Sequence, residues 1–488
     1  MDKSNVSPLE GKREYCGAFG VYSFLGEDVS YDAYRGIVAL QHRGQDSAGI
    51  ATYNGKKIEL TRELGLVSDI FTPKKMQEHE GALAAIGHTR YPTIGAGGKE
   101  DAQPFYIEGV RGGMALAHNG NIANYGRIRA QLEKEGVTLG STCDADLILG
   151  VFAREYKACK DFFEAAKKTM EVLDGSYSVV LISGEGDLVV FRDPHAIRPL
   201  CIGRNKEKII FASESVALDI NGCPLVGDVK PGEVYVVNKE GVKSKVVLAK
   251  EKKHCMFEFV YFSRPDSVIE GKLVHYARME MGRRLAKSAP VEADIVVAVP
   301  DTARSAAVGY SQESKIPIEE GLIKNRYIGR TFIMPSQKKR QDAVRLKLNA
   351  VRKLLEGKRV VLIDDSIVRG TTSGPIVKLV REAGAKEVHM RITCPPVISP
   401  CFYGVDLPTY VELIAANKSV EEIRKMIGAD SLAYLGVEDL VASIGLGKDN
   451  MCLGCITDKY PTAFGNEIAQ KMKKEGRKDG VRIWEEKA

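Results

Sequence analysis

Two patterns of hydrophobic and polar positions divide the chain near its middle. From Cys16 to about Lys250, short apolar runs such as residues 113–122 and 176–183 follow one another closely and are separated by Gly and Asn. Runs at this spacing are typical of hairpins, so we predict a strand-and-helix domain with antiparallel sheets. The helical segments predicted within it are residues 31–41, 125–136 and 144–166.

The pattern changes at about Val274, after which helical and apolar segments alternate. Alternation of this kind predicts an α/β domain built on a parallel, doubly wound sheet. The helices are predicted over residues 274–287, 305–312 and 374–383, and the strands over 294–300, 360–365 and 387–395.

The length of the chain supports the same division. A chain of 488 residues is too long for one ordinary core and suits two domains of about 200 to 250 residues each. The charged segment 243–254 lacks Gly and Pro and is suited to carry the chain from one domain to the next. We therefore predict domains over residues 16–250 and 251–488.

Composition and charge exclude some classes of function. Hydrophobic residues make up 44% of the chain and charged residues 27%, which is normal for a globular protein. The net charge of +6 is too small to indicate nucleic-acid binding. No apolar run approaches the roughly 20 residues of a membrane helix, and residues 1–15 lack the apolar centre of a signal peptide. We predict a cytoplasmic protein whose ten cysteines are buried, catalytic or metal-bound.

An apolar strand that runs into two acids is the most informative local feature. Residues 360–363 are apolar, Asp364 and Asp365 follow, and a loop rich in Gly, Thr and Ser precedes the next helix. Ligands of open α/β sheets bind at such strand ends. Backbone N–H groups there can bind a phosphate, and the carboxylates can bind ribose hydroxyls or hydrated Mg²⁺. The alternative is an ordinary turn whose acids cap the helix.

The whole string 360–373 resembles the PRPP-binding signature of type I phosphoribosyltransferases. This resemblance implies that Asp364 and Asp365 bind the ribose and its metal ion, and that the following loop binds the 5-phosphate. The loop residues are Ser366, Ile367, Val368, Arg369, Gly370, Thr371, Thr372 and Ser373.

In the first half, Cys16 begins a strand of small residues, which would leave its side chain accessible. Alone, such a cysteine is more often a small buried hydrophobe. Residues 41–50, 87–93 and 118–122, however, resemble motifs of the class II glutamine amidotransferases in order and approximate spacing. These are amino-terminal-nucleophile hydrolases, and the resemblance implies a four-layer αββα fold.

In that family the nucleophile is the first residue, because its own α-amine serves as the base. An α-amine has a pKa of about 7.7 to 8.0 and a thiol a pKa of about 8.5, so the pair can exchange a proton close to neutral pH. We therefore interpret residues 1–15 as a propeptide cleaved between Tyr15 and Cys16. The alternative is a disordered amino terminus, which would leave the base acylated.

The same resemblance assigns the remaining roles in this half. Asn119 and Gly120 supply the oxyanion hole, through a side-chain amide and a backbone N–H. Arg90 pairs with the α-carboxylate of glutamine, and Asp144 takes its α-ammonium. His88 lies near the same turn and is given no catalytic part.

Together, the two halves resemble the amidophosphoribosyltransferase family, which opens purine biosynthesis. The resemblance implies that ammonia from glutamine displaces pyrophosphate from PRPP to give 5-phosphoribosylamine. Residues 261–267 match an interdomain motif, and 299–310 match a second PRPP-contacting turn. Thr302 stands where the family usually has serine, and its hydroxyl is a candidate Mg²⁺ ligand beside Asp364 and Asp365.

The stretch 324–349 is strongly basic, and such a run is usually a solvated face. In the family it is the flexible loop that closes over PRPP and excludes water. The candidates for pyrophosphate contact and for sealing the ammonia path are Lys324, Arg326, Tyr327 and Arg330.

Cys452 and Cys455 form a Cys-x2-Cys pair, which suits zinc, a redox pair or a cluster. Cys255 and Cys401 align with the other two ligands in family members that carry a [4Fe-4S] cluster, although Cys394 competes with Cys401. We predict the cluster as a structural tether, with zinc as the alternative.

Two other functions remain open from the sequence. Another class II amidotransferase, such as a sugar-phosphate synthase, would not need the acids at 364–365. A PRPP-sensing regulator of phosphoribosyltransferase fold would not need the Cys16 motifs. The family further implies feedback inhibition by purine nucleotides and a homotetramer, with glutamine and PRPP as substrates and no nucleic acid or membrane as a partner.

Overall fold

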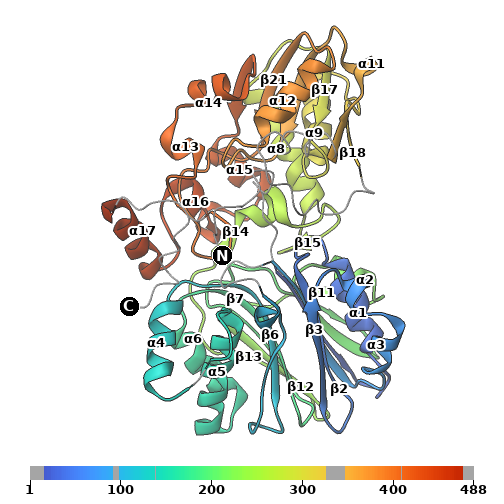
Figure 1. Ribbon diagram of the computed structural model, residues 1–488, viewed down its shortest axis with the longest axis vertical. Coiled ribbons are helices and arrows are strands. Elements are labelled where there is room, and N and C mark those ends of the chain that lie inside the picture. Colours follow the sequence, from blue (N-terminus) through green and yellow to red (C-terminus); the bar gives the residue numbers. More distant parts are fainter. Residues whose placement is uncertain (1–15, 92–97, 138, 326–346, 408, 476–488) are drawn as a thin grey trace.

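The computed structural model describes residues 16–91, 98–137, 139–325, 347–407 and 409–475 (Figure 1). Two antiparallel sheets face each other in the first half, the lower part of Figure 1. The first sheet has the order β11 (Leu225–Asp228), β9 (Cys201–Arg204), β10 (Lys208–Ala212), β1 (Gly17–Ser23), β4 (Ala84–Arg90), β2 (Ser47–Tyr53) and β3 (Ile58–Leu64). The second has the order β13 (Gly241–Val246), β12 (Glu233–Asn238), β8 (Leu188–Arg192), β7 (Gly175–Ser183), β6 (Met114–Ile122) and β5 (Phe105–Ile107).

Helices cover the outer faces of both sheets. Every residue of β7 is buried, because the strand packs against the first sheet on one face and lies under helices on the other. The first sheet is covered by α1 (Ser30–Ala39), α2 (Val67–Ile70), α3 (Pro73–Gln77) and α7 (Val216–Asp219), and the second by α4 (Tyr125–Lys134), α5 (Asp144–Cys159) and α6 (Phe162–Val172). The predicted four-layer αββα arrangement is confirmed.

One predicted helix is divided in the structure. Residues 144–166 were expected to be continuous, but α5 ends at Cys159 and α6 begins at Phe162. Lys160 adopts a left-handed conformation with φ of 57°, and the Asp161 side chain accepts a hydrogen bond from the backbone N–H of Glu164 at 2.8 Å. An amino-terminal cap of this kind starts a new helix. Apolar spacing alone carries no such information.

The second half is built on a parallel sheet, as predicted. Its strand order is β17 (Ile295–Ala298), β20 (Arg359–Asp364), β21 (Glu387–Ile392) and β22 (Ser431–Tyr434). Residues 360–363 are completely buried, as is typical of a parallel strand with both faces covered. Its helices are α8 (Val274–Ser288), α9 (Arg304–Ser314), α11 (Arg352–Leu355), α12 (Ser373–Glu382), α13 (Ile414–Asn417), α14 (Val420–Ile427) and α15 (Val437–Ile444).

Short elements connect the two halves. Residues 243–246, the start of the predicted connecting segment, belong to strand β13, and the chain then runs to β14 (His254–Cys255). There β14 pairs in parallel with β23 (Met451–Cys452), which brings the carboxy-terminal region back to the junction. The other small elements are η2 (Glu258–Phe262), β15 (Val268–Ile269), β16 (Lys272–Leu273), β18 (Leu322–Lys324), β19 (Leu348–Ala350), α16 (Gly454–Thr457) and α17 (Ala463–Glu475).

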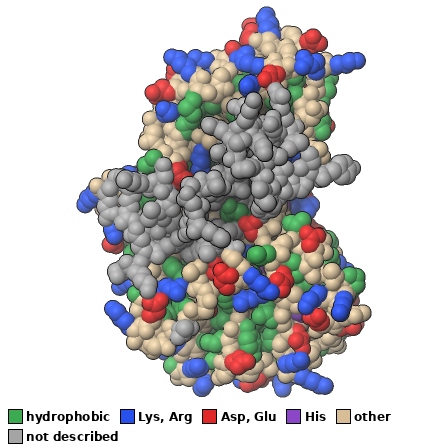
Figure 2. All heavy atoms as spheres, viewed as in Figure 1, with side chains coloured by type: hydrophobic (Ala, Val, Ile, Leu, Met, Phe, Trp, Pro, Cys, Tyr) green, Lys and Arg blue, Asp and Glu red, His purple; other side chains and the backbone are tan. Residues whose placement is uncertain are grey.

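The two halves make direct hydrogen bonds. The Asn121 side chain donates to the carbonyl of Phe402 at 2.9 Å, and the Ser176 hydroxyl donates to the carbonyl of Tyr403 at 2.8 Å. On the face shown in Figure 2, basic and acidic side chains are interspersed over both halves. Within the part of the chain that the structure describes, no helix has the length and apolar character needed to cross a bilayer.

Two candidate active sites and a cysteine group

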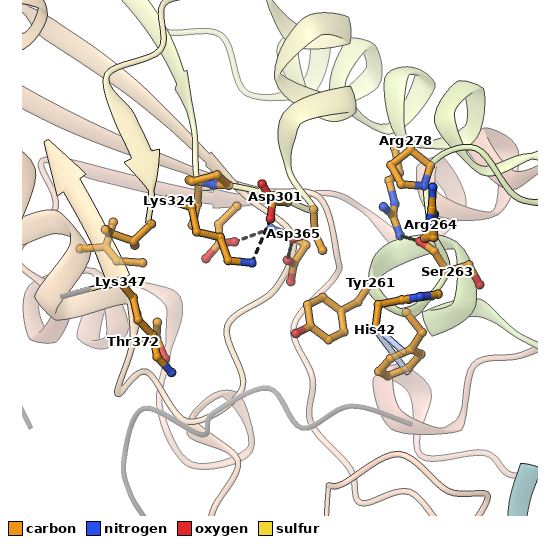
Figure 3. A pocket seen from close by; sticks show the side chains of 18 of the residues that line it. His42, Tyr261, Ser263, Arg264, Arg278, Asp301, Lys324, Lys347, Asp365 and Thr372 are labelled. Carbon is orange, nitrogen blue, oxygen red and sulfur yellow. Dashed lines mark hydrogen bonds and ion pairs between the residues drawn. The ribbon is translucent and has the colours of Figure 1, made fainter. Parts of the chain in front are cut away.

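A cavity of about 810 Å³ lies where the two halves meet (Figure 3). Its wall includes the ends of the parallel strands and also His42 and Arg43, which follow α1 in the first half. The remaining lining residues are Tyr261, Phe262, Ser263, Arg264, Pro265, Arg278, Val299, Pro300, Asp301, Thr302, Lys324, Lys347, Leu348, Asp364, Asp365, Thr372 and Ile376.

The two predicted acids lie at the end of β20 and line this cavity. Both are buried, and their position is fixed by hydrogen bonds: Asp365 N–H donates to Asp364 Oδ1 at 2.9 Å, and the Ser366 hydroxyl donates to Asp365 Oδ1 at 2.7 Å. The hydroxyl of Thr302 donates to Asp365 Oδ2. The structure therefore brings together the three residues expected to ligate Mg²⁺.

The loop between the acids and α12 uses its residues in different ways. Ile367 and Val368 are buried in the core, and the Val368 carbonyl accepts a hydrogen bond from the N–H of Ile414 at 2.9 Å. The Arg369 guanidinium pairs with Glu412 at 3.1 Å. Thr372 lines the cavity, and Ser373 opens α12. A loop with this layout offers backbone N–H groups and a helix N-terminus to an anion.

Several cations surround the same cavity. Lys324 Nζ lies 2.9 Å from Asp301 Oδ2 at the cavity wall, and Lys347 lines it as well (Figure 3). The other candidates from the basic stretch, Arg326, Tyr327 and Arg330, lie outside the described residues.

Arg278 on α8 is a cavity residue that sequence reasoning missed. Its Nε donates to the carbonyl of Phe259 at 2.7 Å, and Nη2 donates to the carbonyl of Ser263 at 2.8 Å. Burial lowers its pKa to about 10, and the charge of Asp365 opposes that shift. In the sequence Arg278 is one of several basic residues of the same helix, so no local signal separates it from the exposed ones.

Cys16 lies in the second candidate site, just before β1. It is buried, whereas the sequence predicted an accessible side chain, and its Sγ is 3.6 Å from the carbonyl oxygen of Tyr91. Burial raises the pKa of the thiol, while the positive charge of Arg90 lowers it. Arg43 Nε donates to the Cys16 carbonyl at 3.0 Å.

Asn119 and Gly120 lie near Cys16 on β6. Asn119 Nδ2 donates to Ser213 Oγ at 3.2 Å, and this hydroxyl also accepts from the N–H of Ala18 at 3.0 Å. A Cβ at Gly120 would collide with the carbonyl oxygen of Ser176, so only glycine fits there. Ser213 thus ties the candidate oxyanion hole to the strand that follows Cys16, a link that no motif indicated.

Arg90 and Asp144 lie close enough to Cys16 for their charges to shift the pKa of its thiol. Asp144 accepts hydrogen bonds from His118 Nε2 at 2.9 Å and from the N–H of Ile122 at 3.2 Å. Burial acts to raise the pKa of Asp144, but the charge and hydrogen bond of His118 outweigh it and the pKa is lowered. The carboxylate is therefore held ionised, as an ammonium partner must be.

His88 and Asp101 complete the surroundings of this site. His88 Nε2 lies 3.0 Å from the carbonyl oxygen of His118, and burial holds its pKa well below the usual value. Arg90 lies 3.9 Å from Asp101, in the helical turn η1 (Lys99–Asp101). Asp101 was not singled out from the sequence, because an isolated Asp carries no spacing signal. His118 stands in the motif 118–122 but was given no role of its own.

Four cysteines gather at the junction. Cys255 in β14 is directly opposite Cys452 in β23, and all of Cys255, Cys401, Cys452 and Cys455 are buried. Cys401 Sγ accepts hydrogen bonds from the N–H groups of Tyr403 and Val405 at 3.3 and 3.4 Å. Burial raises the pKa of Cys455 well above its usual value, and the charges of the other three thiols raise it further. Among the described residues, no set of three or more His, Cys, Asp or Glu converges on a point as ligands of one ion do.

Comparison with known proteins identifies the family. Residues 88–219 match the model of a glutamine amidotransferase domain. The chain is 48% identical to an amidophosphoribosyltransferase of Methanothermobacter thermautotrophicus over 461 residues, which covers 94% of this chain and 97% of that protein. It is 44% identical to the enzyme of the same name from Bacillus subtilis, covering 94% and 96%.

A solved structure agrees with these sequences. Glutamine PRPP amidotransferase from B. subtilis, complexed with ADP and GMP, matches with a TM-score of 0.87 and 42% identity, over 96% of this chain and 100% of that one. Because the similarity extends over nearly the whole of both proteins, the chain belongs to the amidophosphoribosyltransferase family, the glutamine-dependent PRPP amidotransferases.

Proposed function

We propose that Cys16 and the Asp364–Asp365 cavity are the two active sites of one reaction. As an amidophosphoribosyltransferase, the protein is an enzyme of purine biosynthesis that converts glutamine and PRPP to 5-phospho-β-D-ribosylamine, glutamate and pyrophosphate. The position of Arg43 is the observation that supports the two-site proposal. It lines the cavity and also donates a hydrogen bond to the carbonyl of Cys16.

At the first site the thiol of Cys16 attacks the side-chain amide carbon of glutamine. The charge that develops on the amide oxygen is stabilised by the Asn119 side chain and the Gly120 N–H, and ammonia leaves as the C–N bond breaks. Water then releases glutamate from the thioester. Arg90 and Asp144 hold the α-carboxylate and α-ammonium of the substrate.

A base is needed at this site, because burial raises the pKa of the Cys16 thiol. We assign the base to the α-amine of Cys16 after removal of residues 1–15. These residues lie outside the described part of the chain. Processing at this point remains a prediction of the family resemblance and of this chemical requirement.

At the second site ammonia attacks the anomeric carbon of PRPP, and the bond to pyrophosphate breaks. Lys324, Lys347 and Arg278 supply positive charge at the cavity wall. The oxygens of Asp364, Asp365 and Thr302 are hard donors that suit Mg²⁺, which binds through few protein ligands and the phosphates of its substrate. When bound, Mg²⁺ would balance the charge of the pyrophosphate. Arg326, Tyr327 and Arg330 are proposed to contact the leaving group.

We propose that the four cysteines at the junction hold a [4Fe-4S] cluster. Burial and mutual charge raise the pKa of Cys452 and Cys455, and a positive metal centre, when bound, would favour their thiolate forms. Four cysteine thiolates are the ligands that such a cluster takes, and four thiolates also suit zinc. We follow the family resemblance in proposing the cluster, which would join β14 to β23 as a structural tether.

Regulation and assembly are also proposed from the family. The B. subtilis relative was solved with ADP and GMP, and we propose that purine nucleotides inhibit this enzyme too. A homotetramer in the cytoplasm remains a further prediction. A PRPP-sensing regulator is not favoured, because it would have no use for the buried constellation of Cys16, Arg90 and Asp144.

The Asp365→Asn variant tests the division of labour. We expect it to lose phosphoribosylamine formation from both glutamine and ammonium, while glutamate is still released from glutamine. Asp439→Asn serves as the matched control, because Asp439 is a half-buried partner of Arg284 and does not line the cavity. If Asp365→Asn formed the product at the parent rate with either nitrogen source, the assignment of the second site would be wrong.

Native mass spectrometry under anaerobic conditions, followed by denaturation, tests processing and the cluster together. We expect the loss of residues 1–15 and an added mass that fits four iron and four sulfide. A full-length chain that hydrolyses glutamine, or a mass that fits one zinc, would overturn the corresponding proposal.

A further inference from the structure

The loop between the two acids and α12 is supported by one short segment of the carboxy-terminal region. This segment, residues 409–417, includes α13 and is here called the backing segment. The N–H of Ile414 in this segment donates to the Val368 carbonyl at 2.9 Å. A Cβ placed at Gly370 would lie only 2.8 Å from Ile414 Cδ1, so the loop backbone lies directly against this side chain. The backing segment therefore contacts the loop both by a backbone hydrogen bond and by packing.

Between these two loop residues, Arg369 forms an ion pair with the backing segment. Its Nη2 lies 3.1 Å from Glu412 Oε1. The other carboxylate oxygen, Oε2, accepts a hydrogen bond from the Thr409 hydroxyl at 3.0 Å. The paired side chains are 20% and 22% exposed. Because Thr409 already restricts Glu412, less side-chain entropy is lost on pairing than at an ordinary surface ion pair.

Arg369 is the only charged residue of the loop 366–373, yet its side chain is not part of the cavity wall. Among the described residues of this loop, only Thr372 lines the cavity (Figure 3). An arginine that bound the 5-phosphate directly would have to leave Glu412 or share its guanidinium between two anions. The phosphate is therefore left to the backbone N–H groups of the loop and to the N-terminus of α12.

We propose that Arg369 and Glu412 are positioning residues for the 5-phosphate of PRPP, and that neither side chain binds the phosphate itself. The proposal rests on the assignment of the cavity as the PRPP site. Glu412 anchors Arg369, and Ile414 anchors the residues on either side of it. The loop then offers its backbone N–H groups at one fixed place. A loop that is ordered in advance loses less conformational entropy when the substrate binds.

Glu412→Gln and Glu421→Gln form a matched pair for the test. Both changes remove one negative charge and keep the shape of the side chain. Glu421 also pairs with an arginine, but its partner is Arg424 on the same helix α14, and it does not line the cavity. Arg369→Gln, alone and combined with Glu412→Gln, completes a double-mutant cycle, which measures whether the two side chains act as one unit.

The measurement is the inhibition of ammonium-dependent synthesis by two competitors of PRPP. Ribose 5-phosphate carries the 5-phosphate alone, whereas pyrophosphate corresponds to the other end of the substrate. The inhibition constant of each competitor, the KM for PRPP and kcat are determined for the parent and for every variant, alongside the unfolding temperature.

We expect Glu412→Gln to raise the inhibition constant of ribose 5-phosphate and the KM for PRPP by about tenfold, as the loss of one hydrogen bond to a charged group can do. The inhibition constant of pyrophosphate and kcat should change little, because the acids and the basic wall of the cavity are unchanged. Arg369→Gln should match Glu412→Gln, and the double variant should lose no more than either single change. Glu421→Gln should behave as the parent does.

Two results would overturn the proposal. A much larger loss in Arg369→Gln than in Glu412→Gln would show that Arg369 binds the phosphate directly. Equal losses for ribose 5-phosphate and pyrophosphate in Glu412→Gln would show that the ion pair only supports the fold.

A milder variant covers the case in which Glu412→Gln does not fold. Thr409→Val removes the second hydrogen bond to Glu412 without changing any charge. We expect it to raise the inhibition constant of ribose 5-phosphate by a smaller factor, and an unchanged constant would contradict the proposal. If neither competitor displaced PRPP from the parent protein, the assignment of the second site would fail, and the proposal with it.

Discussion

At Cys16, burial and charge act on the thiol in opposite directions. Burial raises the pKa, and the positive charge of Arg90 lowers it. The same Arg90 is proposed to bind the substrate carboxylate, which would neutralise that positive charge when glutamine arrives. The thiol therefore depends on a neighbouring base once the substrate is bound, which agrees with a role for its own α-amine.

Asn119→Ala tests the oxyanion hole. We expect glutamine hydrolysis to fall by about 100- to 1000-fold, as is usual when one such donor is removed. Ammonium-dependent synthesis is expected to change far less, because Asn119 lies at the first site. Asn121→Ala is the control: it lies two residues further along β6 and donates to the Phe402 carbonyl. Equal losses with both nitrogen sources, or in both variants, would count against the assignment.

Asp228→Asn tests the electrostatics at the edge of the first sheet. Burial, with the charge of Glu270, raises the pKa of Asp228 from 3.8 to about 6. The raised pKa means that the ionised carboxylate destabilises the folded state above about pH 6, by up to about 3 kcal/mol, and that this cost disappears as pH falls toward about 4. We expect the variant to melt higher than the parent at pH 8 and nearly equally at pH 4. A pH-independent difference would refute this explanation.

The sequence marks Cys16, Arg90, Asp144 and the pair Asp364–Asp365 as candidates, because each stands in a recognisable motif. It was not sufficient to find their partners. Ser213 and Arg278 act on these groups from distant segments, and a single Ser or Arg has no spacing that marks it. His118 stands inside the motif 118–122, but the motif assigned it no role.

At the scale of elements, β14 and β23 form a separate sheet of two very short strands. Each strand has two residues, and isolated pairs of strands are at best marginally stable even when longer. Their pairing places Cys255 against Cys452. A metal cluster at this point would supply the stability that the strands lack.

Cys452→Ser tests this role. We expect the purified protein to lose its iron and to melt at a lower temperature, because the tether between the junction and the carboxy-terminal region is cut. Cys159→Ser is the matched control, since Cys159 lies at the end of α5 with its Sγ near the carbonyl of Asp161. Iron content and optical absorbance are the measurements. Full iron content in Cys452→Ser would exclude Cys452 as a ligand.

The elements themselves could be predicted well where their pattern was strong. The alternation of helical and apolar segments after Val274 predicted the parallel sheet, and the closely spaced apolar runs before Lys250 predicted the antiparallel sheets. Edge strands such as β3 and β11 were missed, because half-exposed strands show weak apolar runs. The break between α5 and α6 was missed because it depends on the backbone conformation of Lys160.

At the scale of the whole molecule, the cavity belongs to both halves. The parallel sheet supplies its acids and phosphate loop, while His42 and Arg43 come from the amidotransferase half. The sequence predicted two halves, each with its own candidate active site. It did not predict that both halves line one cavity, because no local pattern indicates contacts between distant segments.

The central claim is that one chain contains a glutaminase at Cys16 and a separate synthase at the cavity. The most direct measurement is the rate of phosphoribosylamine formation by Cys16→Ala, with glutamine and with ammonium compared in the same assay. We expect no product from glutamine and a rate with ammonium close to that of the parent. Loss of both activities in a folded variant, or retention of the glutamine-dependent one, would contradict the account.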